Sequence, residues 1–155
     1  MSALVFVDTN VLVYAHDADA GTKRDTAVAL LETLWAGRTG VVSTQVLEEF
    51  YSTATRKLGA RVGAERIREA LRGYAEWPVQ VISVATVFDA VRIAERYRVH
   101  FWDGLIVAAA AQAGATTLVS EDFQDGARMA GVRVRNPFQA NGGRRAGSGE
   151  RGAAG

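Results

Sequence analysis

The sequence begins with a short apolar run that ends at an acidic residue. Residues 4–7 read Leu-Val-Phe-Val, and Asp8, Thr9 and Asn10 follow directly. Four consecutive branched and aromatic residues are typical of a strand buried on both faces, as in a parallel sheet. Thr9 and Asn10 are residue types that begin helices, so Asp8 is expected in the strand-to-helix turn. Ligands bind at this edge in open α/β sheets.

Short apolar segments alternate with helical periodicity along most of the chain. The expected strands are 4–7, 40–43, 79–82, 117–120 and 132–135, and the expected helices are 10–15, 23–36, 45–58, 64–75, 87–97 and 104–111. The last helix is apolar nearly all round, which places it in the middle of the molecule. Strands that alternate with helices predict an α/β fold, a three-layer α/β/α domain with a central parallel sheet.

Two finer expectations concern the helices. Gly59 is expected to end helix 45–58, because glycine commonly follows the last helical residue. Helix 87–97 is expected to bury a stripe that contains Val87, Ala90, Val91 and Ala94.

The length and composition fit one domain with a tail. A chain of 155 residues, 48% of them hydrophobic, is long enough to fill a single core. Residues 1–138 are expected to form this domain. Residues 139–155 hold six of the sixteen glycines and almost nothing to bury, so this tail is expected to be disordered.

No segment of the sequence indicates export or membrane insertion. Residues 1–8 lack the basic flank and the long apolar region of a signal peptide. The longest apolar run, 105–111, is far shorter than the roughly 20 residues that span a bilayer. We therefore expect a soluble cytoplasmic protein.

Acidic residues recur at the carboxyl edge of the predicted sheet. Asp8 follows the first strand, Glu48 and Glu49 lie in the helix after the second, Asp103 begins the apolar helix, and Asp122 follows the fourth strand. Carboxylates forced together repel one another, and a divalent cation is the usual resolution. With no cysteine and two histidines in the chain, its ligands would be mainly oxygen atoms. Magnesium or manganese is favoured, with calcium behind them.

Each acid also has a plainer interpretation. Asp8 and Asp103 could be helix caps, Asp122 a turn residue, and Glu48 or Glu49 part of a solvated helix face. Helix geometry alone does not choose between the two glutamates. The coincidence of the acids on one edge is what favours a metal site.

Four segments together resemble a known family. They are Val-Phe-Val-Asp-Thr-Asn-Val-Leu at 5–12, Ser-Thr-Gln-Val-Leu-Glu-Glu-Phe at 43–50, Trp-Asp-Gly-Leu-Ile at 102–106 and Leu-Val-Ser-Glu-Asp-Phe at 118–123. In order, spacing and context the chain resembles the PIN domain family over about residues 3–138. It is most similar to the VapC-like ribonuclease toxins of bacterial toxin–antitoxin pairs.

The resemblance implies roles for individual residues. Asp8, Glu49, Asp103 and Asp122 match the four acids that hold Mg²⁺ or Mn²⁺ and form the catalytic site. Glu49 is preferred to Glu48 because the family motif places its acid immediately before Phe or Leu. Asn10 and Ser120 match polar positions that support the acids by hydrogen bonding.

The resemblance also implies the activity and the partners. It points to a metal-dependent endoribonuclease that hydrolyses single-stranded or loop RNA, in which a cation activates water so that no Ser, Cys or His nucleophile is needed. A small cognate antitoxin and a homodimer are implied as well.

RNA that approaches an acidic site needs a basic rim. The net charge is +1, of which Arg144, Arg145 and Arg151 against Glu150 supply +2, so the rest of the chain carries −1 and is not globally basic. The candidates for local RNA contacts are Arg56, Lys57, Arg61, Lys23 and Arg24. A solvated helix surface with ordinary ion pairs is an equally good interpretation.

Three other functions compete with the nuclease. A haloacid-dehalogenase-like phosphatase would use Asp8 as its nucleophile, but Asn10 stands where its second acid belongs, and no lysine precedes the last acidic motif. A phosphoacceptor receiver domain lacks support for the same reason. The third is a non-catalytic PIN-fold binding module, against which the complete set of acids argues.

Overall fold

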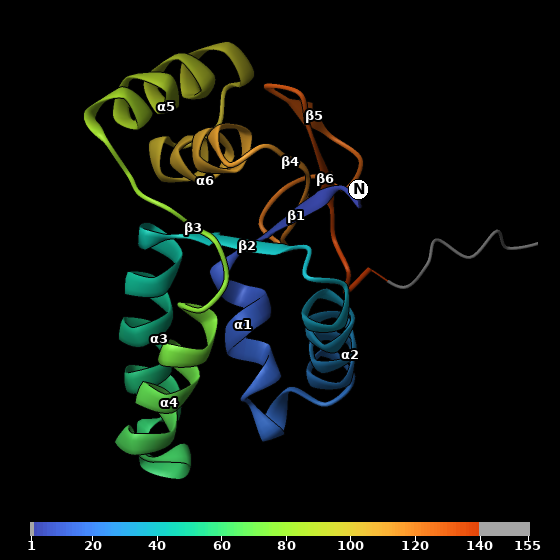
Figure 1. Ribbon diagram of the computed structural model, residues 1–155, viewed down its shortest axis with the longest axis vertical. Helices are drawn as coiled ribbons and strands as arrows, with labels where there is room; N and C mark the ends of the chain where they lie inside the picture. The colour runs from blue at the N-terminus through green and yellow to red at the C-terminus, as the bar shows by residue number, and fades with distance from the viewer. Residues whose placement is uncertain (1, 140–155) are drawn as a thin grey trace, which may run out of the picture.

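The computed structural model describes residues 2–139 and shows one sheet with helices on both faces (Figure 1). Its strands are β1 (Leu4–Val7), β2 (Gly40–Ser43), β3 (Val79–Gln80), β4 (Ala115–Val119), β5 (Arg128–Met129) and β6 (Val132–Arg135). Their order across the sheet is β3-β2-β1-β4-β6-β5. All neighbours are parallel except β5 and β6, which are antiparallel. The predicted α/β class is confirmed.

The helices form two layers. They are α1 (Thr9–Ala15), α2 (Thr22–Gly37), α3 (Thr44–Val62), α4 (Ala64–Tyr74), α5 (Val84–Tyr97) and α6 (Phe101–Gln112), with a 3₁₀ helix, η1 (Ala18–Ala20), between α1 and α2. Helices α1 to α4 cover one face of the sheet, and α5 and α6 cover the other (Figure 1). The predicted three-layer arrangement is confirmed. None of these helices is long and apolar enough to cross a bilayer within the described residues.

Strand β1 lies in the interior of the sheet. Phe6 is paired with Val41 of β2 on one side and Leu118 of β4 on the other, and Phe6 and Val7 are fully buried. This position explains the unbroken apolar run, because a strand with neighbours on both edges and helices on both faces has no solvent side. The next residue, Asp8, is therefore placed at the middle of the carboxyl edge.

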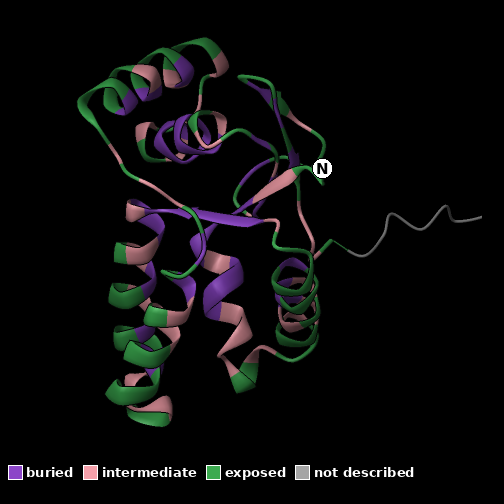
Figure 2. Cartoon of the chain, viewed as in Figure 1, coloured by how far each residue is buried: buried purple, intermediate pink, exposed green. Residues whose placement is uncertain are grey.

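Helix α6 lies between the sheet and α5, and its residues Gly104 to Ala110 are all buried (Figure 2). The approach of α5 is close at Gly104, where an added Cβ would lie 2.7 Å from the carbonyl oxygen of Ala90. A glycine at this position therefore sets the distance between the two helices. The predicted central position of this helix is confirmed.

Two expectations about the helices were wrong. Helix α3 continues through Gly59 to Val62, and the chain turns only at Gly63, whose φ is +89°. Val62, in the last turn, packs against the hydrophobic core, so tertiary packing favours the helix beyond a residue of low helix propensity. Helix α5 begins at Val84, earlier than expected, behind a capping box between Ser83 and Thr86.

The predicted buried stripe of α5 was also partly wrong. Ala90 and Ile93 are buried, whereas Val87 and Val91 are each 38% exposed. The backbone of Ala90 lies against Gly104 of α6, so the inner face of α5 is centred on Ala90 and Ile93. Val87 and Val91 lie beside this face and are partly exposed.

The sheet was expected to be parallel, but the structure contains one antiparallel pair of strands. The two-residue strand β5 pairs antiparallel with β6, Arg128 opposite Arg133 and Met129 opposite Val132. Two residues are too few to show an alternating pattern, so the sequence carries no period-2 signal for this strand. The predicted disordered tail falls almost wholly in residues 140–155, which lie outside the described residues.

Replacing Gly104 with alanine is expected to destabilise the domain by about 1–3 kcal/mol, because the new methyl group would overlap the backbone of α5. Gly59→Ala is the matched control. Nothing lies within 4 Å of a Cβ built at Gly59, and this residue lies inside a helix, so alanine is expected to stabilise by roughly 0.5–1 kcal/mol. Urea unfolding of both variants measures the two effects. Equal stability of Gly104→Ala and the wild type would contradict the close approach.

Candidate metal centre

Asp8 lies at the carboxyl end of β1 and is 4% exposed. It is the N-cap of α1, and its Oδ1 accepts a hydrogen bond from the Thr9 backbone N–H at 2.7 Å. Its Oδ2 accepts one from the Ser120 hydroxyl, also at 2.7 Å. The helix-cap interpretation therefore accounts for one oxygen only, and the second is held by a residue 112 positions further along the chain.

Ser120 and Asn10 join the end of β4 to the start of α1. Ser120 is fully buried, and its hydroxyl oxygen accepts a hydrogen bond from the Asp122 backbone N–H at 3.1 Å. The Asn10 side-chain amide donates to Asp122 Oδ2 at 3.1 Å and to Ser120 Oγ at 3.3 Å. Both residues thus orient carboxylates, which is the contact that a supporting role requires.

Glu49 faces the same edge from the second turn of α3. Its Oε2 accepts from the Thr9 hydroxyl at 3.0 Å, and its Oε1 accepts from the Gln45 amide, also at 3.0 Å. The same Gln45 amide nitrogen lies 3.4 Å from the carbonyl oxygen of Trp102, in the first turn of α6. Glu48 is exposed and has no such contact among the described residues. Glu49 is therefore the glutamate turned toward Asp8.

Asp103 lies in the first turn of α6 and is partly buried. The N-cap position of this helix is His100, so the interpretation of Asp103 as a simple cap is wrong. Asp122 is exposed, in the loop after β4.

Two of the acids, Asp8 and Asp103, have a raised pKa. Burial is the main cause that lifts the pKa of Asp8 to about 7, and the charges of Asp122 and Glu49 add to it, while the hydrogen bonds from Ser120 and Thr9 oppose it. The pKa of Asp103 is also raised, first by burial and then by Asp122, with His100 acting in the opposite direction. All four carboxylates therefore share one electrostatic environment, and it is short of positive charge.

The residues fit a divalent cation with part of its water retained. Among residues 2–139, no group of three or more acidic or histidine side chains lies close enough together to hold a metal ion without other ligands. Mg²⁺ keeps several waters and needs only one or two carboxylates as direct ligands. The Oε1 atom of Gln45 is buried without a hydrogen-bond partner, although the amide nitrogen beside it contacts Glu49. The site therefore retains one buried acceptor, beside Glu49, that could accept a hydrogen bond from a ligand.

The candidate RNA-binding residues are differently placed. Arg56 and Lys57 are exposed on α3, and Arg24 is exposed on α2. Arg61 pairs with Asp17 and Asp19. Lys23 forms an ion pair with Glu121 at 2.9 Å, so its charge is directed at the loop that carries Asp122.

Sequence reasoning missed several residues that hold the site together. Thr9 and Gln45 both bind Glu49, and the i, i+4 spacing of Gln45 and Glu49 is a signal that could have revealed one of these contacts. The Tyr14 hydroxyl donates to Glu121 at 2.5 Å, beside Lys23. No sequence pattern indicates this contact, because it joins α1 to a loop more than one hundred residues away.

The fold and the site define an α/β protein with a cluster of carboxylates at the carboxyl edge of a parallel sheet. The model of the family described as "PIN domain" matches residues 5–130, and the chain belongs to this family. No curated protein sequence matches the chain.

Several solved structures have the same fold. A toxin–antitoxin complex from Klebsiella pneumoniae is 19% identical, covers 88% of this chain and 99% of its own, and has a TM-score of 0.65. FitAcB from Neisseria gonorrhoeae is 20% identical over 88% of this chain and 100% of its own, also with a TM-score of 0.65. VapC20 from Mycobacterium tuberculosis is described as a sarcin–ricin loop cleaving toxin. It is 19% identical over 83% of this chain and 98% of its own, with a TM-score of 0.60.

The raised pKa of Asp8 predicts how stability depends on pH when metal is removed by a chelator. Between the ordinary value of 3.8 and about 7, the unfolded chain releases a proton that the folded chain retains. The free energy of unfolding should therefore fall as the pH rises through this range, by an amount on the order of a few kcal/mol, and level off above it. Asp8→Asn should lack this component.

Urea unfolding between pH 4.5 and 8 measures the difference between the two proteins. Glu48→Gln, which neutralises an exposed acid of the same helix as Glu49, serves as the control and should follow the wild type. Parallel curves for the wild type and Asp8→Asn would mean that Asp8 ionises in the folded protein at its ordinary pKa.

Proposed function

We propose that this protein is a metal-dependent endoribonuclease, the toxin of a toxin–antitoxin pair, that uses Mg²⁺ or Mn²⁺. The observation that carries the proposal is that the charges of Glu49 and Asp122 raise the pKa of both Asp8 and Asp103, which brings the four carboxylates together at a single edge of the sheet. Carboxylates that lie close together repel one another and destabilise the folded protein. Such a group is typical of a site that a bound cation stabilises.

The proposed catalytic site divides its work among these residues. When bound, the cation lowers the pKa of a water molecule and stabilises charge on the phosphate oxygens. One or two of the four carboxylates would bind the cation directly, with Asp8 and Asp122 at the ends of β1 and β4 and Glu49 and Asp103 on α3 and α6, and the others would act through water molecules that the cation retains. Ser120 fixes one oxygen of Asp8, Asn10 fixes Asp122, and Thr9 with Gln45 fixes Glu49.

The similar structures support the choice of substrate and partner. VapC20 is described as cleaving the sarcin–ricin loop, which favours an RNA loop as the substrate here. Its fold and the PIN family match are the link to this chain. The Klebsiella structure is a complex of a toxin with its antitoxin, which favours a cognate antitoxin for this chain. We propose in addition that the protein is a homodimer and acts in the cytoplasm.

The surroundings of Asp8 disfavour the phosphatase alternative. The phosphatase needs a second acid two residues after its nucleophile, and this chain has Asn10 there. The Asn10 amide donates to Asp122 Oδ2 at 3.1 Å, so this position supplies a hydrogen-bond donor and not a carboxylate. Lys23, the lysine that approaches this region, is paired with Glu121 and not with Asp8.

Metal binding is expected to raise the melting temperature. At a hundredfold excess of Mn²⁺ over its Kd, the stabilisation of the wild type is about 2.7 kcal/mol, which corresponds to several degrees. Asp8→Asn and Asp122→Asn should lose most of the rise, and Glu48→Gln should keep it. Differential scanning fluorimetry with Mn²⁺ and with a chelator measures it. A rise that is equal in all four proteins would contradict the proposed ligands.

The activity is tested with purified protein, free of antitoxin, and a panel of end-labelled RNAs that includes hairpin loops. Cleavage is expected in Mn²⁺ or Mg²⁺ and not in chelator. Asp8→Asn and Glu49→Gln should reduce the rate more than a hundredfold, since each removes a charge from the cation site, while Glu48→Gln should cleave at the wild-type rate. Cleavage that persists in Asp8→Asn would overturn the proposed mechanism, and a stable phosphorylated Asp8 would favour the phosphatase.

A further inference from the structure

A cavity lined by basic and apolar residues lies at the far end of α1 and α3, the helices that carry Asp8 and Glu49 near their starts. Its volume is about 320 Å³, and it is formed where the end of α1, η1 and the start of α2 meet the end of α3 and the start of α4. We call it the arginine pocket, and its lining residues are Ala15, His16, Ala18, Arg24, Leu58, Arg61, Val62 and Arg66. Three guanidinium groups line it, and no carboxylate does.

The positive charges of this pocket are of two kinds. Arg61 is held by Asp17 at 3.4 Å and by Asp19, and Asp17 is itself fixed because it accepts from the Asp19 backbone N–H at 3.0 Å. Arg24 and Arg66 are exposed, and no carboxylate of the described residues lies within ion-pairing distance of either. The charge of Arg61 is thus neutralised by two aspartates that hold its side chain in place, whereas Arg24 and Arg66 can pair with a ligand.

His16 also lines the pocket. Burial and the nearby Arg24 lower the pKa of its ring, which disfavours the charged form. Its Nε2 lies 2.7 Å from the hydroxyl of Tyr74, which fixes the ring against α4. The apolar floor of the pocket, Leu58 and Val62, belongs to α3.

The arginine pocket and the metal centre lie at opposite ends of one helix pair. Helix α1 packs beside α3, with the Thr9–Glu49 hydrogen bond at one end and the Asp17–Arg61 ion pair beyond the other. Arg61 follows Glu49 by twelve residues, which is about 18 Å along a helix. A nucleic acid strand that crosses the acids along this seam would therefore reach the pocket several nucleotides away.

We propose that the arginine pocket binds one phosphate group of the RNA substrate, several nucleotides from the phosphate that is cut at the metal centre. This inference rests on the proposed nuclease function. The guanidinium group of arginine can donate two parallel N–H hydrogen bonds to phosphate oxygens. Two neighbouring arginines without carboxylate partners repel each other, and a bound anion would relieve this repulsion. The apolar floor would lie against the sugar of the same nucleotide.

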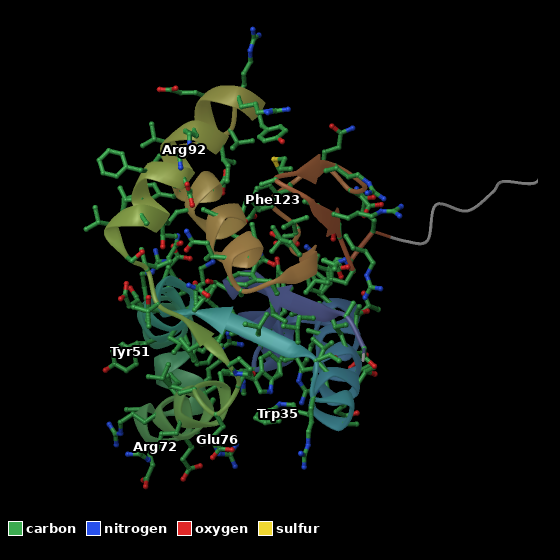
Figure 3. All side chains as sticks on the ribbon, turned by 45° about the horizontal axis from the view of Figure 1, so that its top comes forward. Trp35, Tyr51, Arg72, Glu76, Arg92 and Phe123 are labelled. Carbon is green, nitrogen blue, oxygen red and sulfur yellow. The ribbon has the colours of Figure 1, made fainter. Side chains whose placement is uncertain are left out.

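The test compares an RNA that spans both sites with one that cannot. The probes are a fluorescein-labelled single-stranded RNA of twelve nucleotides and a labelled trinucleotide, whose phosphodiesters are adjacent. Binding is followed by fluorescence anisotropy in chelator, which prevents cleavage, over a series of KCl concentrations. The proteins are the wild type, Arg24→Ala/Arg66→Ala, and the control Arg92→Ala/Arg96→Ala. The control makes the same change of net charge on α5, in the other helical layer (Figure 3).

Loss of the pocket should weaken binding of the long RNA about tenfold and weaken binding of the trinucleotide less, because only the long RNA can reach both sites at once. The slope of log K against log salt should become shallower by about 0.7, the value for one lost phosphate contact on a single strand. The arginines replaced in the two variants are all exposed, so both variants are expected to melt at the temperature of the wild type. Equal melting temperatures would show that the variants are folded.

Three results would overturn the inference. The first is equal binding of the long RNA by the pocket variant and the α5 control, and the second is the same loss for both RNA lengths. The third is a preference of the wild-type pocket for a hexaglutamate peptide over the RNA, which would assign it to an acidic protein partner. Failure of this inference can be distinguished from failure of the proposed function. If the wild type cleaves RNA but the pocket variant binds the long RNA as well as the wild type does, only the proposed phosphate site is refuted.

Discussion

The buried carboxylate of Asp8 is the group to which the rest of the site is adjusted. It needs hydrogen-bond donors on both oxygens because it lies under other side chains at the middle of the sheet, and it receives them from Thr9 and Ser120. These two residues come from opposite ends of the domain sequence. Correct pairing of β1 with β4 is therefore a condition for a satisfied Asp8, so fold and site are specified by the same contacts.

Helix α6 connects this edge to the opposite layer of the molecule. Its apolar surface is buried between α5 and the sheet, and the contact at Gly104 sets how deep the helix lies. Asp103 is the residue directly before this contact, and Trp102 accepts from Gln45 of α3. Small residues of the core thus determine where an acidic side chain of the edge is held.

The sequence was informative where a physical pattern was local and strong. The apolar residues of β1 and β2 and the alternating valines and arginines of β6 defined these strands, and parallel topology alone brings residues that follow β1 and β4 to one edge. The phase of α5 was wrong because its inner face is chosen by the fit to Gly104, and the end of α3 was wrong because tertiary packing overcame Gly59. Contacts such as Gln45 with Trp102 depend on the angle between two helices, which no single-sequence pattern encodes. The catalytic roles of the four acids remain a prediction.

Both edges of the sheet are closed by very short strands. β3 and β5 have two residues each, while the longer strands lie between them. An edge of this length presents few free backbone N–H and C=O groups, so the domain offers little template for strand addition by another chain. A protein that binds this domain must instead recognise side chains on its helices, and aggregation through exposed sheet edges is disfavoured even when the protein is present without a partner.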